Sequence, residues 1–248
     1  MPTGSVFTSD GGARFRHGPW RGSALTAQIV PIGGGPINEA AVVQVFEVVS
    51  SLGFSEFLTS ALGPAEQEPF LAVGFRVHET LRLLELSLDD DAPARPSMST
   101  RRMRRRDLAP SLAIDASSFT SFWQFDAEAL REALSATPKS RRRVVRSGAN
   151  VLGYAVTGHA GTTGFIQRLA VEPQSREVGI GSSLLADGLC WLHGRRVRTV
   201  LVNTQPENRA ALSLYERFGF VDRPGGLAVL RFEGSLPATT LRPTEEMP

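Results

Sequence analysis

The sequence has a single cysteine, Cys190, and no apolar run that approaches the roughly 20 residues needed to span a membrane. One cysteine excludes an intrachain disulfide framework and any metal site built on several cysteines. Residues 1–22 lack the apolar core of a secretory signal peptide. These absences predict a protein of the reducing cytoplasm, with no membrane partner and no bound metal.

The chain also has little net charge, +2 at neutral pH, so its overall balance does not predict binding to nucleic acid. The charges are nevertheless clustered in two arginine-rich runs, "RRMRRRD" at 101–107 and "KSRRRVVR" at 139–146. One interpretation is a solvated face or strand edge, and the other is a groove for an acidic partner or a polyanion. No nucleic-acid-binding motif accompanies the runs, so nucleic acid is not a predicted partner.

Apolar residues make up 42% of the 248 residues and charged residues 21%, as in soluble globular proteins. An acidic, proline-containing segment, "LDDDAPARPSMST" at 88–100, is typical of a linker between two halves. We therefore expect a flexible arm over 1–20, a first domain over 21–92, a linker over 93–99, a second domain over 100–233 and a flexible tail over 234–248.

Apolar spacing predicts strands and helices in both halves. The first half should contain strands at 24–32, 56–62 and 77–88, and helices at 37–54 and 65–75. The second half should contain a strand at 99–106, helices at 107–119 and 125–136, three strands within 141–173, a helix at 180–193, a strand at 198–203, a helix at 207–218 and a strand at 227–233. This order predicts an α/β fold with a mixed sheet and helices on both faces.

The stretch "SREVGIGSSLL" at 175–185 places Gly179 and Gly181 where a helix begins. It is not a Walker loop, because no lysine follows the last glycine, and the third small residue of a dinucleotide fingerprint is replaced by Leu184. The first turn of a helix offers unpaired N–H groups, glycine lets a ligand approach them, and Arg176 adds a cation. Both a structural turn and a pyrophosphate site fit this pattern.

A second motif, "NRAALSLYERFGF" at 208–220, fits a helix that stops at Gly219. Asn208 can cap this helix or reach a ligand amide, and Ala211 leaves room for a thin ligand. Tyr215 can present its phenol to a reacting centre or pack at the edge of the core.

Together, the patterns LAV-x4-REVGIG and NxxAxxLYxxxGF resemble those of the GNAT superfamily of acetyl-CoA-dependent N-acetyltransferases. The resemblance covers roughly residues 100–233. It implies a mixed, mostly antiparallel central sheet flanked by helices. It also implies transfer of an acetyl group from acetyl-CoA to a primary amine, by direct attack through a tetrahedral intermediate.

The resemblance also assigns roles to residues. Leu169 and Val171, with Ala170 between them, would bind the pantetheine arm as an added strand does, and a backbone N–H there could polarise the thioester carbonyl. Asn208 and Ala211 would contact the cofactor arm, and Tyr215 would be the general acid that protonates the departing thiolate. The pyrophosphate would be held by the backbone amides of Arg176, Glu177, Val178, Gly179, Ile180, Gly181 and Ser182.

The sequence departs from the family pattern in the strand before "LAV", where many members carry a glutamate that serves as general base. Phe165 and Gln167 stand there instead. Asp126, Glu128, His159 or a chain of water molecules could replace that base, and the residues do not decide among them. The aromatic residues at 119–125 fit either core packing or an acceptor pocket.

The first half carries a faint echo of the same pattern. "AEQEPFLAVGF" at 65–75 ends in Gly-Phe before a strand, and "GGGP" at 33–36 occupies the place of the glycine motif, where Pro36 removes an amide donor. We therefore expect a degenerate partial copy of the fold without cofactor, which could shape the acceptor site or mediate a homodimer.

The acceptor amine is not identified by the sequence and could belong to a small molecule or a protein N-terminus. Mycothiol synthases also pair a degenerate copy with an active one, so acetylation of a small thiol-sugar amine is an alternative. A non-catalytic acetyl-CoA sensor is a second alternative.

Overall fold

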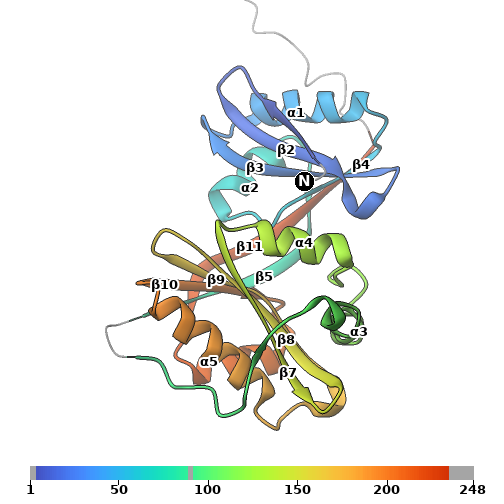
Figure 1. The fold of residues 1–248 in the computed structure, drawn as a ribbon. Coiled ribbons are helices and arrows are strands. Elements are labelled where there is room, and N and C mark those ends of the chain that lie inside the picture. Colours follow the sequence, from blue (N-terminus) through green and yellow to red (C-terminus); the bar gives the residue numbers. More distant parts are fainter. Residues whose placement is uncertain (1–3, 89–91, 235–248) are drawn as a thin grey trace, which may run out of the picture. The chain divides into compact units, whose positions relative to one another are not determined.

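A computed structural model describes residues 4–88 and 92–234, and the chain divides into two compact units (Figure 1). The first unit comprises residues 1–81 and 225–248, and the second unit comprises residues 82–224. Residues 225–233, which we expected to close the second domain, therefore belong to the first unit. The reason is that Ala228 and Leu230 are buried in the hydrophobic core of the first unit. The predicted tail lies outside the described residues beyond Gly234.

The first unit is a sheet with the strand order β1-β2-β3-β4-β11. Its strands are β1 (Ser5–Thr8), β2 (Ala13–Pro19), β3 (Thr26–Gly34), β4 (Glu56–Thr59) and β11 (Val221–Glu233). The pair β3–β4 is parallel, and the other pairs are antiparallel. Two helices, α1 (Glu39–Ser51) and α2 (Pro64–Ala72), complete the unit, together with a short 3-10 turn at Trp20–Gly22.

The flexible arm expected over 1–20 is not what the described residues show, because β1 and β2 lie there. In β2, Ala13, Phe15 and His17 are buried while Arg14 is exposed. This alternation has the period of a half-buried strand. It is spread over so few apolar residues that the sequence analysis did not recognise it.

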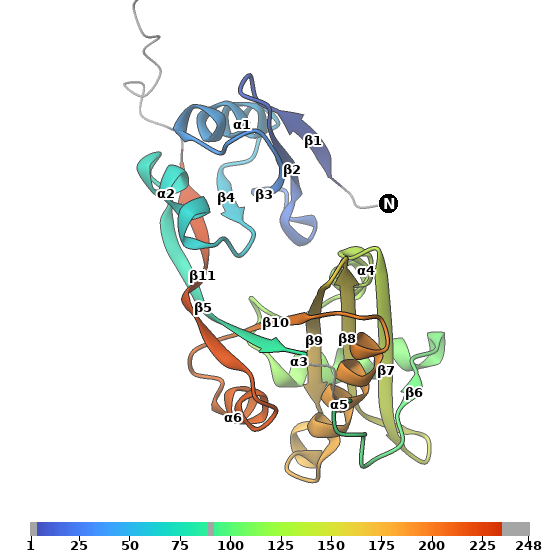
Figure 2. The same ribbon diagram turned by 90° about the vertical axis from the view of Figure 1, so that its left-hand side faces the viewer.

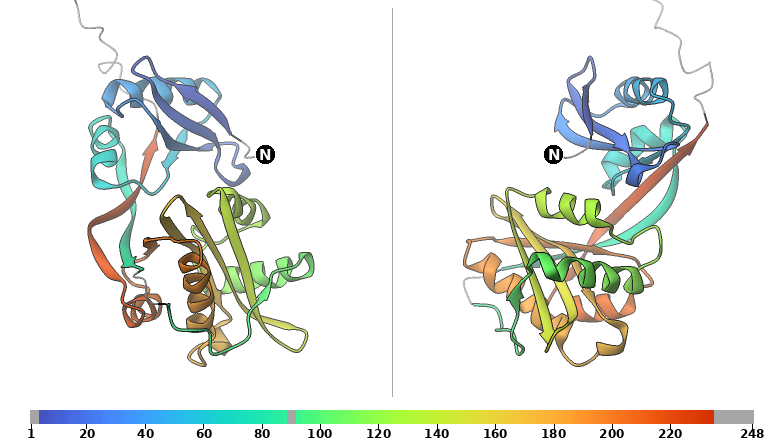
Figure 3. Two further views of the ribbon diagram at one scale, coloured as in Figure 1. Left: turned by 60° about the vertical axis from the view of Figure 1, so that its left-hand side comes forward. Right: turned by 45° about the vertical axis from the view of Figure 1, so that its right-hand side comes forward.

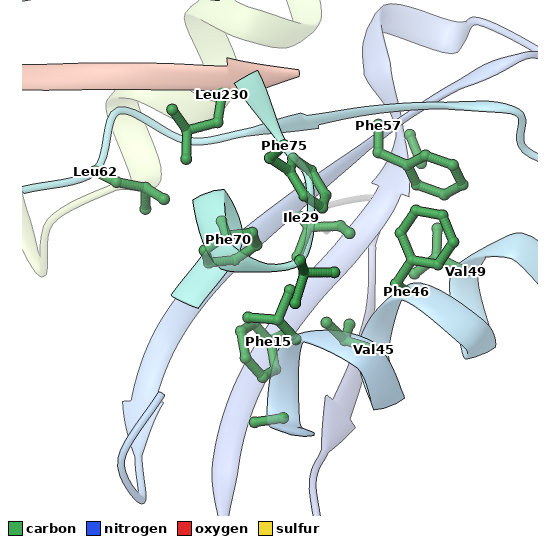
Figure 4. Close-up of a cluster of buried hydrophobic side chains, with 14 of the residues drawn as sticks. Phe15, Ile29, Val45, Phe46, Val49, Phe57, Leu62, Phe70, Phe75 and Leu230 are labelled. Atoms are coloured by element: carbon green, nitrogen blue, oxygen red, sulfur yellow. The ribbon is translucent and has the colours of Figure 1, made fainter. Parts of the chain in front are cut away.

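Phenylalanine rings and aliphatic side chains together form the core of the first unit (Figure 4). Phe46 of α1 stacks on Phe57 of β4 with ring centroids 4.4 Å apart, and it meets Phe232 of β11 edge to face at 4.9 Å. The helix begins where expected, because the Asn38 side chain accepts a hydrogen bond from the Ala41 N–H. The predicted apolar face of α1 is the buried one.

The second unit is a sheet with the strand order β5-β10-β9-β8-β7-β6. Its strands are β5 (Arg76–Ser87), β6 (Arg101–Arg102), β7 (Lys139–Ser147), β8 (Asn150–Ala160), β9 (Thr163–Val171) and β10 (Thr199–Thr204). Only β9–β10 is parallel. The prediction of a mixed, mostly antiparallel sheet is confirmed, although the strand expected at 99–106 is reduced to two residues followed by a 3-10 turn at Arg105–Asp107.

Helices cover both faces of this sheet, as predicted (Figure 3). On one face, Ile114 of α3 (Leu108–Ser118) and Leu130 of α4 (Ala127–Ser135) lie in a core with Val144 and Tyr154. On the other face, Ile180 and Leu184 of α5 (Ile180–His193) pack with Val145 and Ala155. The last helix, α6 (Arg209–Arg217), joins a core with β10 and α5. No helix among the described residues is long and apolar enough to cross a membrane.

Part of the second arginine run turns inward onto the buried Asp187 of α5. Arg141 donates to this carboxylate at 2.7 Å, Arg143 at 3.3 Å and the Thr100 hydroxyl at 2.6 Å. Met98, in the segment predicted to be a linker, donates its N–H to Ser183 Oγ of α5 at 3.1 Å. The run is therefore more than a solvated face, and residues 97–100 are held against α5.

This cluster predicts a pH-dependent stability. Burial alone would raise the pKa of Asp187, but the hydrogen bonds from Arg141 and Thr100 and the two arginine charges hold it below its ordinary value. The lowered pKa means that the carboxylate stabilises the fold above the unfolded value of 3.8, and that this contribution is lost as the pH falls below it.

Asp187→Asn should therefore lower the free energy of unfolding of the second unit by about 1–3 kcal/mol at pH 7. The difference from wild type should shrink as the pH falls below 3.8. Denaturant melts of both proteins between pH 7 and pH 3 measure this, and a gap that is independent of pH would contradict it.

Candidate active site

A β-bulge in β9 opens one edge of the sheet. The register of β8 and β9 shifts between Val156 and Thr157, which leaves Gln167 as the extra residue on β9. β10 pairs with β9 only as far as Phe165, and then continues along β5 to Thr204. Beyond the bulge, β9 and β10 diverge (Figure 2), so residues 166–171 have no strand partner on that side.

The open edge presents the backbone groups of Leu169 and Val171. The Glu172 N–H donates to the Leu152 carbonyl of β8 at 2.9 Å, which makes residues 152 and 172 a hydrogen-bonded pair. Hydrogen-bonded pairs alternate with non-hydrogen-bonded pairs along an antiparallel ladder. The backbone N–H and C=O groups of Ala170 therefore face β8, while those of Leu169 and Val171 face away from β8. The Val171 carbonyl already accepts the Ser118 hydroxyl at 3.2 Å. An extended ligand could pair with this edge as a further strand.

Helix α5 starts after this edge and is separated from it by eight residues, 172–179, which form a 3-10 turn at Pro173–Ser175 and a short loop. Gly179 is its N-cap, with φ of 90°, and the Ser183 N–H makes the first helical hydrogen bond, 2.9 Å to the Gly179 carbonyl. The N–H groups of Ile180, Gly181 and Ser182 lie ahead of that bond. They form the positive end of the helix dipole and can hold an anion.

Gly179 and Gly181 differ in the structural reason for which glycine stands at the position. Gly179 needs its left-handed backbone conformation, and a Cβ there would contact only Ser97 Oγ, at 3.9 Å. A Cβ on Gly181 would lie 3.4 Å from Leu214 of α6, 3.7 Å from Val171 and 3.9 Å from Leu169. The start of α5, the end of β9 and α6 therefore converge at Gly181, and the missing side chain keeps the backbone N–H groups accessible.

The other residues of the predicted cradle lie at its rim. Arg176, Glu177 and Val178 are exposed, and Glu177 has a left-handed φ of 67°. Ser182 is half-buried. The Ile180 side chain is buried in the core, so only its backbone can face a ligand.

Helix α6 brings the second motif to the same region. The Asn208 Oδ1 accepts the Ala211 N–H at 3.2 Å, so this side chain caps the helix. Tyr215 is buried, with its ring 5.5 Å from that of Phe220. Burial raises the pKa of the Tyr215 phenol well above its usual range, and the Arg168 charge offsets this only in part. A tyrosine phenol is protonated at neutral pH even at its ordinary pKa, so the side chain is a neutral hydrogen-bonding group here.

Beside the bulge lies a buried polar network that the sequence analysis missed. The fully buried Asp115 of α3 accepts two hydrogen bonds from the Arg168 guanidinium, both 2.7 Å long, and one from the Phe125 N–H at 2.6 Å. The Tyr154 hydroxyl also donates to Asp115. Burial and the Asp115 charge raise the pKa of Tyr154 above its usual range. A charged residue inside the apolar run "FIQRLAV" was the available signal.

Two of the aromatic residues at 119–125 serve this network. The Arg168 guanidinium lies between the rings of Phe119 and Phe125, 3.5 Å and 4.0 Å from their centroids. Phe122 and Trp123 pack edge to face, 5.0 Å apart. The network thus holds the segment between α3 and α4 against β9.

The three side chains considered as replacements for the general base make other interactions in the structure. Asp126 caps α4 by accepting the Ala129 N–H at 2.7 Å, and Glu128 forms an ion pair with Arg131. The His159 ring packs on Trp191. Gln167 Oε1, at the bulge, is buried without a hydrogen-bond partner among the described residues.

The two glycines yield a stability test. Gly179→Ala forces alanine into a left-handed conformation and should cost about 1–2 kcal/mol of unfolding free energy. Gly181→Ala has an ordinary helical position and should stay within about 0.5 kcal/mol of wild type. Denaturant melts of both variants measure this, and equal losses would contradict the separate roles.

Comparison with known proteins identifies sequence relatives of the second unit. Residues 110–220 match the model of the acetyltransferase (GNAT) family. The chain is 26% identical over 129 residues to a protein of Bacillus subtilis provisionally named ribosomal protein bS18-alanine N-acetyltransferase, a match that covers 52% of this chain and 83% of the relative. It is 29% identical over 164 residues to the mycothiol acetyltransferase of Acidimicrobium ferrooxidans, covering 60% of this chain and only 53% of that relative.

Solved structures share the fold. The tandem GNAT protein from the clavulanic acid biosynthesis pathway superposes with a TM-score of 0.65 at 15% identity, covering 91% of this chain and 80% of that one. A GCN5-related N-acetyltransferase from Sphaerobacter thermophilus gives 0.60 at 14% identity, covering 90% and 76%. The likeness to a tandem protein thus extends beyond the residues that match the family model. The chain therefore carries a GNAT-family acetyltransferase domain over residues 110–220, and it is an acyltransferase enzyme.

Proposed function

We propose that the second unit transfers the acetyl group of acetyl-CoA to a primary amine by direct attack through a tetrahedral intermediate. The observation that carries this proposal is the junction of the open β9 edge with the unpaired N–H groups at the start of α5. A strand-like ligand arm with a pyrophosphate at one end is complementary to that junction.

Acetyl-CoA has this shape and charge. Its pyrophosphate would accept hydrogen bonds from the N–H groups of Ile180, Gly181 and Ser182, beside the Arg176 cation. Its pantetheine arm would pair with Leu169 and Val171, and a backbone N–H of this edge would polarise the thioester carbonyl. Because the Asn208 oxygen is used in the helix cap, its amide nitrogen is the atom left to contact the arm.

In the proposed reaction a neutral amine forms a C–N bond to the acetyl carbon, and the C–S bond breaks as CoA leaves. Tyr215 donates its phenolic proton to the departing thiolate as general acid. Gln167 carries an amide, which is not basic at neutral pH, so it cannot take the proton from the amine. We infer that this proton leaves through water, while the unpartnered Gln167 Oε1 accepts an N–H of the acceptor.

Two acceptor classes fit the comparisons. A protein N-terminus is favoured by the Bacillus subtilis relative, because the match spans 83% of its length. A small thiol-sugar amine is favoured by the mycothiol acetyltransferase, because that match spans 60% of this chain. Incubation with acetyl-CoA and either an N-terminal alanine peptide or a glucosamine-cysteine conjugate separates them. A homodimer, a cytoplasmic location and the degenerate first copy stay predictions.

Tyr215→Phe tests the catalytic role. Removal of a general acid should lower kcat by about 10²–10⁴-fold, while the Kd for acetyl-CoA stays within about twofold, because the ring and its packing remain. Turnover with an accepted amine and calorimetric titration measure the two quantities. The other tyrosine provides the matched control, since Tyr154→Phe should lower the melting temperature without a comparable loss of kcat. Unchanged kcat in Tyr215→Phe would contradict its role as general acid, and binding of acetyl-CoA without turnover of any amine would favour a sensor.

Gly181→Ala tests the binding role. The added methyl group would lie among Leu214, Val171 and Leu169, where the proposal places the cofactor. We expect acetyl-CoA affinity to fall by about tenfold or more, equal to a loss of at least about 1.4 kcal/mol, without loss of stability. Unchanged affinity in a calorimetric titration would contradict the proposed position of acetyl-CoA.

A further inference from the structure

A pocket of about 140 Å³ lies beside the edge strand β6, and arginines surround it. A single water molecule needs only about 10–15 Å³ of such space, so the pocket has room for a tetrahedral oxyanion. β6 pairs only with β7 and precedes α3 (Figure 2). The residues lining the pocket are Arg101, Arg102, Arg104, Arg106, Asp107, Val144 and Arg146.

The single carboxylate of this pocket is already used. Asp107 accepts a hydrogen bond from the Arg104 backbone N–H at 2.7 Å and forms an ion pair with Arg146. Both residues of that pair are largely buried. Asp107 therefore neutralises Arg146 and leaves the charges of the other four arginines uncompensated.

The other four arginines of the pocket are exposed, as are Arg76, Arg209 and Arg217 elsewhere in the chain. No hydrogen bond or ion pair joins the side chain of Arg101, Arg102, Arg104 or Arg106 to any residue within 4–88 or 92–234. Elsewhere, Arg82, Arg131, Arg141, Arg143, Arg168, Arg223 and Arg231 are all paired with carboxylates. Like charges that line one hollow repel one another, and an anion bound there relieves that repulsion.

Exposed charges on an edge strand can serve to prevent pairing with another chain, but that role does not require the charged residues to line a pocket. A single charged side chain on an edge strand suffices to discourage pairing with another chain. Here the unpaired charges line a concave pocket. Guanidinium groups also form paired N–H donors that match the oxygens of a phosphate group.

We propose that this pocket binds a phosphate group of a small phosphorylated molecule. The site is separate from the proposed acetyl-CoA cradle, which begins at Arg176 and uses backbone N–H groups of α5. It does not depend on the proposed acetyl transfer. Free inorganic phosphate or pyrophosphate and a phosphorylated metabolite are two sources of the same chemistry.

Calorimetric titration of the full chain with inorganic pyrophosphate in 150 mM chloride tests the proposal. We expect one site that survives saturation with acetyl-CoA, since acetyl-CoA competes only for the cradle. Arg102→Gln with Arg104→Gln should weaken this site by about tenfold or more, because charged hydrogen bonds are lost. The same titrations with inorganic phosphate and with glucose 6-phosphate distinguish a free anion from a phosphorylated metabolite.

Arg105→Gln is the matched control, because Arg105 is an exposed member of the same run that does not line the pocket. Its affinity for pyrophosphate should stay within about twofold of wild type. Arg101→Gln with Arg106→Gln repeats the test if the first double variant melts at a lower temperature. An equal effect of Arg105→Gln, no acetyl-CoA-resistant site, or binding of a glutamate peptide in preference to pyrophosphate would each overturn the proposal.

Discussion

The hydrogen-bonded contact between Arg168 and Asp115 is the interaction on which the second unit depends. A fully buried carboxylate collects donors from β8, β9 and the segment after α3, so one side chain fixes three parts of the chain. Loss of either charge would leave the other buried and unpaired, at a cost of about 3–5 kcal/mol. Because Arg168 directly follows the bulged Gln167, this contact also anchors the point where β9 and β10 part.

The function that we propose for the second unit depends on the separation of β9 and β10. An open strand edge exists only because β9 continues past the end of its pairing with β10. The chain then turns through the left-handed Gly179 into α5, which directs unpaired N–H groups toward the end of this edge. Helix α6 adds a buried, protonated phenol. Binding groups and a proton donor are thus held by regular elements, with only a short loop between them.

The sequence predicted the start of α5 at Gly179 because the signal for it is local. Gly179 marks a left-handed backbone conformation, a feature that depends on the residue itself and its immediate neighbours. The Arg168–Asp115 contact could not be predicted, since its partners lie 53 residues apart. Strand β2 was missed because only three residues carry its alternation. Residues 225–233 were assigned to the wrong unit because Leu230 packs against residues distant in the sequence, and such packing leaves no local sequence pattern.

Calorimetric titration of the full chain with acetyl-CoA tests the central claim most directly. The account predicts one site per chain, because the first unit has proline in place of a cradle amide, and it predicts at least tenfold weaker binding in Arg176→Glu. No binding, or two equal sites per chain, would contradict the assignment of the β9–α5 junction as the single acetyl-CoA site.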